Sequence, residues 1–222
     1  MRLALFDLDH TLIPLDSDHA WGEFTVKLGW RDAQVFSQAN DRFYNDYKTG
    51  TLDIQRYVRF AIEAVREQGL AVAQKAHERF MHEVIAPAMG EPARALVRQH
   101  QAAGDTVLIV TATNEFVTRP IARAFGVDEL IAIELERDDR GEPTGAIRGT
   151  PSFREGKTAR VEQWLAARGL DWSRVEHSTF YSDSINDLPL LERVHEPVAT
   201  NPDARLRAIA LERGWRTLNL FE

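Results

Sequence analysis

The chain has 222 residues, with 27 Lys and Arg against 34 Asp and Glu, and it contains no cysteine. At about 100–200 residues per domain, this length allows one large domain or a core with a smaller companion. The absence of cysteine excludes disulfides, thiolate nucleophiles and cysteine–zinc sites. The formal net charge of −7 argues against a nucleic-acid partner, which would require cations to displace counterions from the phosphates.

The N-terminal segment reaches Asp7 after a short apolar run, which is too short for a signal peptide. Nowhere in the chain do about 18 consecutive apolar residues occur, as a membrane span requires. We therefore expect a soluble cytoplasmic protein with no membrane partner.

The chain opens with a short apolar run, Leu3 to Phe6, that predicts a buried strand with Asp7 at its carboxyl end. Between Pro14 and Pro87 the apolar residues recur three and four apart, which predicts helices and no strand. The periodic positions are Trp21, Phe24 and Leu28; Val35, Ala39, Phe43 and Tyr47; Tyr57, Ala61, Ile62 and Val65; and Val72, Ala76, Phe80 and Val84. This segment is predicted to be a helical insertion.

Helices and strands alternate after the insertion. The predicted elements are a helix over 92–103, a strand over 107–110, a helix over 115–125 that Pro120 kinks or begins, a β-hairpin over 131–147, a helix over 157–168, strands over 178–181 and 197–199, a helix over 203–213 and a strand over 215–220. The hairpin is predicted to lie outside the sheet, as a flap. Strands that alternate with helices predict an α/β fold with a parallel sheet flanked by helices.

Polar residues follow three of the predicted strands directly. These residues are Asp7, Thr111 and Asp183. Because ligands of parallel α/β sheets bind outside the carboxyl ends of the strands, we expect these side chains to converge at one edge.

The segment Asp7-Leu8-Asp9 places two carboxylates beside one pocket. One carboxylate can attack phosphorus and hold the phosphoryl group covalently. The other can protonate the leaving oxygen and then deprotonate water. The alternative interpretation is an ordinary turn or helix cap.

The segment Asp183-Ser184-Ile185-Asn186-Asp187 carries a second acidic pair. Asp183 and Asp187 would share a face if a helix begins there, and the alternative is capping by Asp183 or Ser184. Carboxylates that face Asp7 would repel it unless a hard cation lies between them, and Mg²⁺ suits oxygen ligands while keeping waters for a phosphate.

Thr111 opens the segment Thr111-Ala112-Thr113, whose hydroxyl and backbone N–H groups can form an anion cradle or a simple helix cap. Lys157 is predicted at the start of a helix, where a cation opposes the helix dipole. This position indicates either a function for its charge or a solvated side chain.

These four segments, in this order, resemble the motifs of the haloacid dehalogenase superfamily. The insertion resembles the helical cap of the phosphoserine-phosphatase-like branch, and so does the hairpin. The resemblance implies a Rossmann-like core over residues 1–13 and 92–222, with a cap over residues 14–91. It also implies a phosphatase.

The resemblance implies roles for individual residues. Asp7 would be the nucleophile, and Asp9 the general acid and base with its backbone carbonyl on Mg²⁺. Asp183 would be a further Mg²⁺ ligand. The remaining positions of the motifs are Thr111, Ala112 and Thr113 at the phosphoryl group, Lys157 as the balancing charge, Asp187 supporting Asp183, and Asn186 orienting Lys157.

The cap is expected to recognise the leaving group. Asp16 and Asp18 could bind a substrate amine, or they could cap a helix. Arg42, Arg56 and Arg59 could bind a carboxylate, or they could form a solvated helix face.

The function predicted is Mg²⁺-dependent hydrolysis of a small phosphorylated metabolite, an amino-acid or amino-alcohol phosphate such as phosphoserine or histidinol phosphate. Many phosphoserine phosphatases have Ser-Gly-Gly where this chain has Thr111-Ala112-Thr113, which argues against phosphoserine. The alternatives are a phosphotransferase and a non-catalytic phosphate-binding protein.

Overall fold

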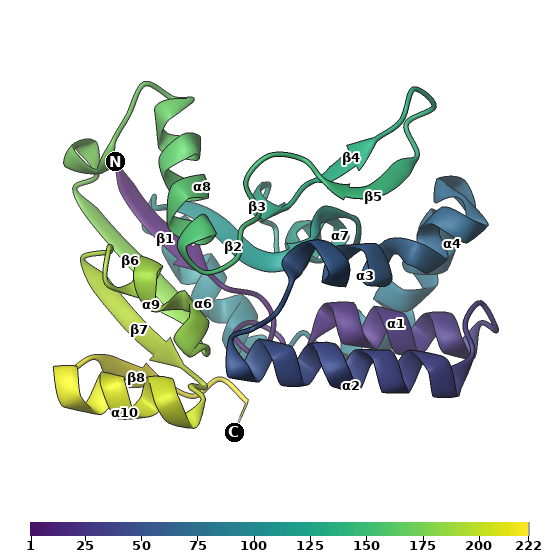
Figure 1. Ribbon diagram of the computed structural model, residues 1–222. Helices are drawn as coiled ribbons and strands as arrows, with labels where there is room; N and C mark the ends of the chain where they lie inside the picture. Colours follow the sequence, from purple (N-terminus) through teal and green to yellow (C-terminus); the bar gives the residue numbers. More distant parts are fainter. Residues whose placement is uncertain (222) are drawn as a thin grey trace.

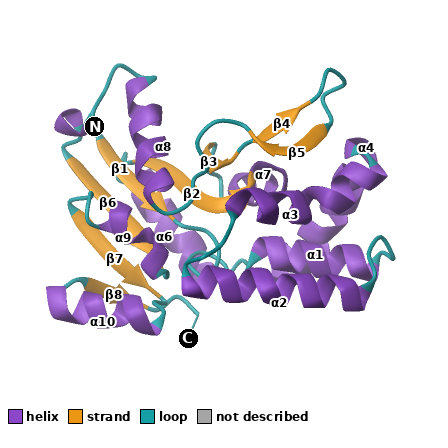
Figure 2. Ribbon diagram, in the orientation of Figure 1, coloured by secondary structure: helices purple, strands orange, loops and turns teal. Residues whose placement is uncertain are grey.

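The computed structural model describes residues 1–221, with the side chain of Lys48 left aside. Its centre is a parallel sheet whose strands lie in the order β3-β2-β1-β6-β7-β8 (Figures 1 and 2). The strands are β1 (Arg2–Phe6), β2 (Thr106–Asn114), β3 (Glu129–Ile133), β6 (His177–Ser182), β7 (Glu196–Thr200) and β8 (Arg216–Leu218). The predicted parallel α/β architecture is confirmed.

Helices cover both faces of the sheet because the apolar side chains of its strands alternate. Leu3 and Leu5 of β1 pack with one set of helices, α8 (Glu155–Ala166), α9 (Leu188–Leu191) and α10 (Ala204–Arg213). Ala4 and Phe6 belong to the cluster on the other face, with α6 (Glu91–Ala102) and α7 (Glu115–Ala124). The candidate site lies at the carboxyl ends of β1 and β6, where Asp7 and Asp183 follow the strands.

The insertion between β1 and α6 is helical, as predicted. It comprises α1 (Ser17–Lys27), α2 (Ala33–Thr49), α3 (Ile54–Gln68), α4 (Leu70–Phe80), the π-helical turn η1 (Met81–Ile85) and α5 (Ala86–Ala88). Asp16, Asp32 and Asp53 begin the first three helices, and each carboxylate accepts a backbone N–H of the first turn. Within residues 1–221, none of the helices combines the length and the apolar character needed to cross a membrane.

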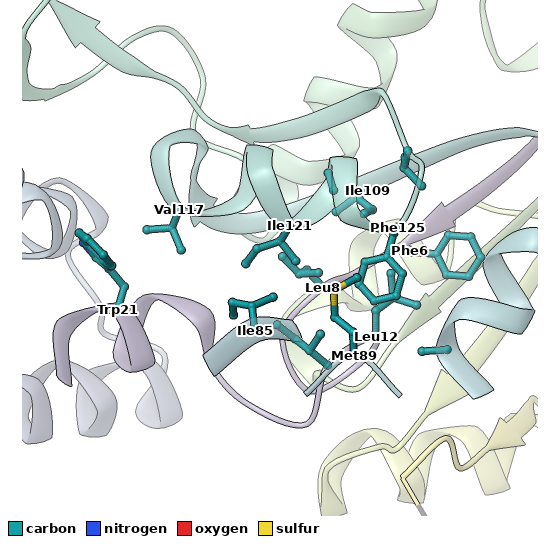
Figure 3. Packing of buried hydrophobic residues seen from close by; sticks show 14 of the residues in the cluster. Phe6, Leu8, Leu12, Trp21, Ile85, Met89, Ile109, Val117, Ile121 and Phe125 are labelled. Carbon is teal, nitrogen blue, oxygen red and sulfur yellow. The ribbon is translucent and has the colours of Figure 1, made fainter. Parts of the chain in front are cut away.

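The insertion and the sheet domain share one apolar cluster. Trp21 of α1 and Ile85 of η1 are fully buried in the same cluster as Val117 and Ile121 of α7 (Figure 3). Leu8, directly after Asp7, is buried there too. The base of the cap is therefore packed on the core, close to the first acidic segment.

The prediction of a single hairpin over 131–147 is wrong in its first half. Residues Glu129–Ile133 form β3, which pairs in parallel with β2 at the edge of the main sheet. Ala132 is buried as well as Ile131 and Ile133, so this strand is covered on both faces. Only β4 (Leu135–Arg137) and β5 (Pro143–Ile147) form the hairpin.

Two further elements differ from their predictions. Strand β2 continues through Thr111 to Asn114, and its pairing with β3 shifts register between Val110 and Asn114. Helix α7 begins at Glu115 under an Asn114 cap, so Pro120 lies inside the helix and does not begin it. Thr111 thus lies within an irregular strand and is not the first residue after it.

His77 of α4 is buried among aromatic rings. The ring centroids of Trp21, Phe80 and Phe116 each lie 5.2 Å from its own. Its Nε2 atom has no hydrogen-bond partner in the described part of the chain. Burial lowers the pKa of His77 from 6.5 to about 4, so the folded protein keeps this imidazole neutral.

We expect stability to fall as the pH drops from about 6.5 to about 4, by up to about 3 kcal/mol from His77 alone. The reason is that the unfolded chain takes up a proton at His77 throughout this window, whereas the folded chain does not. Urea unfolding at pH 7.5 and pH 4.5 tests this, with His77→Phe as the variant that removes the titration. Parallel pH profiles for the two proteins would contradict the expectation.

Candidate active site

Asp7 and Asp183 stand at the ends of adjacent parallel strands. Asp7 follows β1, and its backbone N–H donates to the carbonyl of Tyr181 in β6 at 2.9 Å. Asp183 follows β6 directly. The sheet therefore brings together two carboxylates that are far apart in sequence, as the strand-end pattern predicted.

Lys157 joins Asp7 to Asp187. Its Nζ lies 2.7 Å from Oδ1 of Asp7 and 2.7 Å from Oδ2 of Asp187. Lys157 is in the first turn of α8, and its side chain is only 3% exposed. Burial alone would lower the pKa of Lys157, but the charges of Asp187 and Asp7 outweigh burial and raise it. The lysine is therefore a permanent buried cation.

Asp187 holds Lys157 in place through the ion pair between them. Asp187 also accepts a hydrogen bond from Ser182 Oγ at 2.7 Å. Burial raises the pKa of Asp187 to about 6, the charge of Lys157 opposes that rise, and the charge of Asp7 adds to it. Asn186 lies in the short 3₁₀ turn η3 (Ile185–Asp187), and its N–H donates to the capping hydroxyl of Ser184.

Thr11 links the two strand-end carboxylates. Its Oγ1 lies 3.1 Å from Oδ1 of Asp183 and 3.4 Å from Oδ2 of Asp7, and it accepts the N–H of Asp183 at 3.1 Å. One hydroxyl proton cannot serve both carboxylates at once. Burial, then the charge of Asp7, then the charge of Asp187 raise the pKa of Asp183 well above its usual value.

The charge of this cluster fits a divalent cation. Asp7, Asp183 and Asp187 carry three potential negative charges, and Lys157 supplies one positive charge. No group of three or more His, Cys, Asp or Glu side chains in the described residues is arranged to hold a metal ion alone. A metal here would therefore bind Asp7, Asp183, a backbone carbonyl such as that of Asp9, and water, a set that suits Mg²⁺.

Asp9 is held by one group from the cap and one from the sheet. Its Oδ1 accepts the backbone N–H of Ser17 at 2.9 Å, and its Oδ2 accepts the hydroxyl of Thr113 at 2.8 Å. Burial, the charge of Asp16 and the charge of Asp7 raise the pKa of Asp9 well above its usual value, against the hydrogen bond from Ser17. A carboxyl with a raised pKa retains a proton that it can donate.

The predicted anion-cradle segment is fixed by its own hydrogen bonds. Thr111 Oγ1 accepts the N–H of Thr113 at 3.1 Å, and the Thr111 carbonyl accepts the hydroxyl of Ser152 at 2.6 Å. Thr111 is 1% exposed, whereas Ala112 between the two threonines is half-buried. The segment lies beside Asp9, which the hydrogen bond from Thr113 shows directly.

The two cap aspartates have different positions. Asp16 caps α1, since its Oδ1 accepts the N–H of His19 at 2.8 Å. Asp18 is buried and accepts a hydrogen bond from Asn114 Nδ2 at 3.1 Å. Burial and the charge of Asp16 raise the pKa of Asp18 to about 7. The capping interpretation therefore holds for Asp16 and fails for Asp18.

Asn114 was not singled out from the sequence, and it connects the cap to the sheet. Its Oδ1 accepts the N–H groups of Phe116 and Val117, which caps α7 and turns its Nδ2 toward Asp18. Two hydrogen bonds therefore join the start of α1 to the core, one from Ser17 to Asp9 and one from Asn114 to Asp18. The sequence did hold a signal for it, because Asn114 directly precedes a predicted helix and asparagine is favoured at the N-cap of helices.

We expect Asn114→Ala to lower the free energy of unfolding by about 1–3 kcal/mol, because both the α7 cap and the bond to Asp18 are lost. Asn114→Ser is the matched control, since a serine can cap the helix but cannot reach Asp18. Urea unfolding should place Asn114→Ser between the wild type and Asn114→Ala. Equal stability of Asn114→Ser and wild type would mean that the bond to Asp18 contributes nothing.

The three arginines predicted as possible carboxylate ligands lie on the exposed surface of the cap. Arg42, Arg56 and Arg59 are exposed. Arg56 and Arg59 line a shallow surface hollow with Arg66, together with the rings of Phe43 and Phe60. The solvated-face interpretation fits these three arginines better than a substrate contact.

Comparison with known proteins agrees with this geometry. Residues 4–192 match the haloacid dehalogenase-like hydrolase family. A histidinol-phosphatase of Neisseria meningitidis serogroup C is 45% identical over 218 residues, which are 98% of each chain. Phosphoserine phosphatase SerB1 of Mycobacterium tuberculosis is 33% identical over 215 residues, or 96% of this chain and 68% of that protein.

Two solved structures have the same fold. A protein of unknown function from Bordetella pertussis Tohama I is 49% identical, with a TM-score of 0.93 over 99% of both chains. A substrate-bound phosphoserine phosphatase is 17% identical, with a TM-score of 0.67 over 98% of this chain and 92% of that one. The family match covers most of the chain and includes Asp7 and Asp183, and the chain therefore belongs to the haloacid dehalogenase-like hydrolases.

Proposed function

We propose that this hydrolase is a Mg²⁺-dependent phosphatase that forms an aspartyl-phosphate on Asp7. The observation that supports this most is the placement of Asp7 at the end of β1, 2.7 Å from the buried Lys157, with a second carboxyl two residues further on at Asp9. In this assignment residues 1–13 and 92–222 form the catalytic core, and residues 14–91 form the cap.

In the first half-reaction, a carboxylate oxygen of Asp7 attacks phosphorus and the bond from phosphorus to the ester oxygen breaks. Asp9 donates its proton to the leaving oxygen, which departs as an alcohol. Lys157 donates a hydrogen bond to Asp7 and opposes the negative charge of the phosphoryl oxygens. In this proposal the hydroxyl of Thr111 and backbone N–H groups of the segment Thr111-Ala112-Thr113 would donate hydrogen bonds to those oxygens.

In the second half-reaction, the ionised Asp9 takes a proton from a water molecule. The resulting hydroxide attacks phosphorus, and the bond between phosphorus and Asp7 breaks, which releases phosphate and restores both carboxyls. Asp7, Asp183 and the backbone carbonyl of Asp9 would hold the metal. When bound, Mg²⁺ supplies positive charge beside the phosphoryl oxygens.

The cap side of Asp9 favours an amino-alcohol phosphate as substrate. Burial and the charges of Asp18, Asp16 and Asp9 raise the pKa of Tyr57, so these groups lie close together. A cluster of carboxyl groups suits a protonated amine and disfavours a free carboxylate. The nearby Arg31 donates through Nη2 to the carbonyl of Phe60 and lies over that ring, whereas its Nε and Nη1 have no hydrogen-bond partner in the described residues. We therefore propose L-histidinol phosphate, the substrate class that the name of the 45% identical relative indicates.

The test is phosphate release from L-histidinol phosphate and from L-phosphoserine, each with Mg²⁺ and with excess EDTA. We expect kcat/KM to be about tenfold or more higher for histidinol phosphate, and we expect EDTA to abolish turnover. The opposite ranking would assign the site to an amino-acid phosphate. Release that is equally fast in EDTA would contradict the metal assignment.

The same assay separates the alternative functions. A phosphotransferase would form a phosphorylated acceptor alcohol in place of free phosphate. A non-catalytic phosphate-binding protein would release none from either ester. A carboxyl at Asp9 favours hydrolysis over transfer, because it can activate water against the aspartyl-phosphate.

A further inference from the structure

The last turn of α2 contacts two core loops beside the candidate site. The phenol oxygen of Tyr47 lies 3.0 Å from Oγ of Ser184, the residue after Asp183. The Tyr47 ring lies 6.2 Å from the ring of Phe153, in the loop that leads to Lys157. Helix α2 thus ends on the side of the cap that faces the core (Figure 1).

Arg154 forms the second point of contact. Gly50 ends α2 with a φ of 78°, and a β-carbon at that position would overlap with Nη2 of Arg154. The guanidinium therefore rests directly on the end of α2, and it lies 5.1 Å from the centre of the Phe153 ring. A cation at this end of a helix also complements the helix dipole.

The backbone of Arg154 has a conformation suited to glycine. Its φ and ψ are 54° and −124°, and the turn around it is closed by the N–H of Gly156 on the carbonyl of Phe153 at 2.9 Å. These angles match the first central position of a type II′ turn, where glycine is preferred. A larger residue is strained there, so the side chain of Arg154 has a cost that its contacts must offset.

We propose that Arg154 and Tyr47 are positioning residues that seat α2 on the loops of Lys157 and Asp183 and thereby hold the cap closed over the site. The effect on turnover rests on the proposed function, whereas the seating does not. Tyr47 acts through Ser184, which is the neighbour of Asp183. Arg154 acts from the turn at the start of α8, where its carbonyl accepts the backbone N–H of Lys157 at 2.9 Å.

The test compares Arg154→Gly with Arg154→Ala. Both substitutions remove the guanidinium, but only glycine relieves the strained turn. We expect the Tm of Arg154→Gly to exceed that of Arg154→Ala by about 2–4 °C. We expect both variants to show faster amide hydrogen exchange in Ala33–Thr49, unchanged exchange in β6, and a similar fall in kcat/KM of about tenfold.

Tyr47→Phe isolates the phenol, because it keeps the ring beside Phe153 and removes only the contact with Ser184. It should show the same faster exchange in α2, to a smaller extent. Arg140→Ala, at the exposed hairpin turn, is the control and should leave exchange in α2 unchanged.

Two results would overturn the proposal. One is unchanged α2 exchange in both Arg154 variants, which would mean that any loss of turnover comes from contact with substrate. The other is wild-type kcat/KM in Arg154→Gly, which would mean that only the turn matters. Failure of the wild type to hydrolyse phosphate esters would contradict the proposed function, and the exchange results would still decide the seating.

Discussion

Asp7→Asn is expected to reduce phosphate release by about 10⁴-fold or more while the fold stays intact. The substitution keeps the shape of the side chain, but an amide cannot act as the nucleophile. Removal of a nucleophile usually costs about as much as removal of the whole catalytic group to which it belongs. The measurement is phosphate release at saturating substrate and Mg²⁺, compared with the wild-type enzyme.

Stability should not fall with activity in Asp7→Asn. The charge of Asp7 raises the pKa of both Asp183 and Asp187, so its removal relieves repulsion among buried carboxylates. Lys157 retains Asp187 as an ion-pair partner at 2.7 Å. We therefore expect a Tm equal to or above that of the wild type, in line with the usual opposition between stability and activity at such sites.

A second measurement identifies the phosphorylated residue. Acid quenching of the wild-type enzyme during turnover should trap an acyl-phosphate that hydroxylamine cleaves, and Asp7→Asn should trap none. If Asp7→Asn retains more than about a hundredth of wild-type turnover, the nucleophile lies elsewhere and the assignment of Asp7 is wrong.

The sheet could be predicted from the sequence because its strands are short apolar runs, and polar residues follow two of them at the site. The sequence alone predicted that Asp7 after β1 and Asp183 after β6 lie at the same edge of the sheet. The role of Lys157 was predicted from the family resemblance, because a single lysine at the start of a helix does not by itself distinguish a site residue from a solvated one. The structure adds its two partners at 2.7 Å.

The errors have identifiable physical causes. The alternation of Ile131, Ile133 and Leu135 predicted one hairpin strand, but the chain breaks at Glu134 into an edge strand and a flap strand. Glu134 forms ion pairs with Arg148 and Arg160 at that point, and no local pattern signals those contacts. The bond between Asp18 and Asn114 joins residues 96 apart, and from the sequence alone each of them also fits an ordinary capping role.

Lys157→Met is expected to lower the free energy of unfolding by about 3–5 kcal/mol at pH 8, because breaking a buried ion pair leaves its partners uncompensated. Methionine has a similar length and keeps the packing of the stem. The positive charge between Asp7 and Asp187 is lost, so the repulsion between these two carboxylates is no longer offset. Turnover should also fall by about 10³-fold, since the cation no longer opposes the charge of the transferring phosphoryl group.

The loss of stability in Lys157→Met should grow with pH. The pKa of Asp187 is already raised to about 6 in the folded wild type, and the charge of Lys157 lowers it, so the variant has an Asp187 pKa that is higher still. A carboxyl whose folded pKa exceeds its unfolded pKa destabilises the protein as the pH rises from about 4 through the folded value. The difference in stability between wild type and variant should therefore be small at pH 5 and larger at pH 8.

The double variant Lys157→Met/Asp187→Asn separates charge from packing. It removes one buried negative charge together with the positive one, so it should regain part of the stability at pH 8 and none of the turnover. Urea unfolding at pH 5, 6.5 and 8 makes the comparison. A pH-independent loss in the single variant would mean that the lysine stabilises this site through packing, and that its charge does not lower the pKa of Asp187.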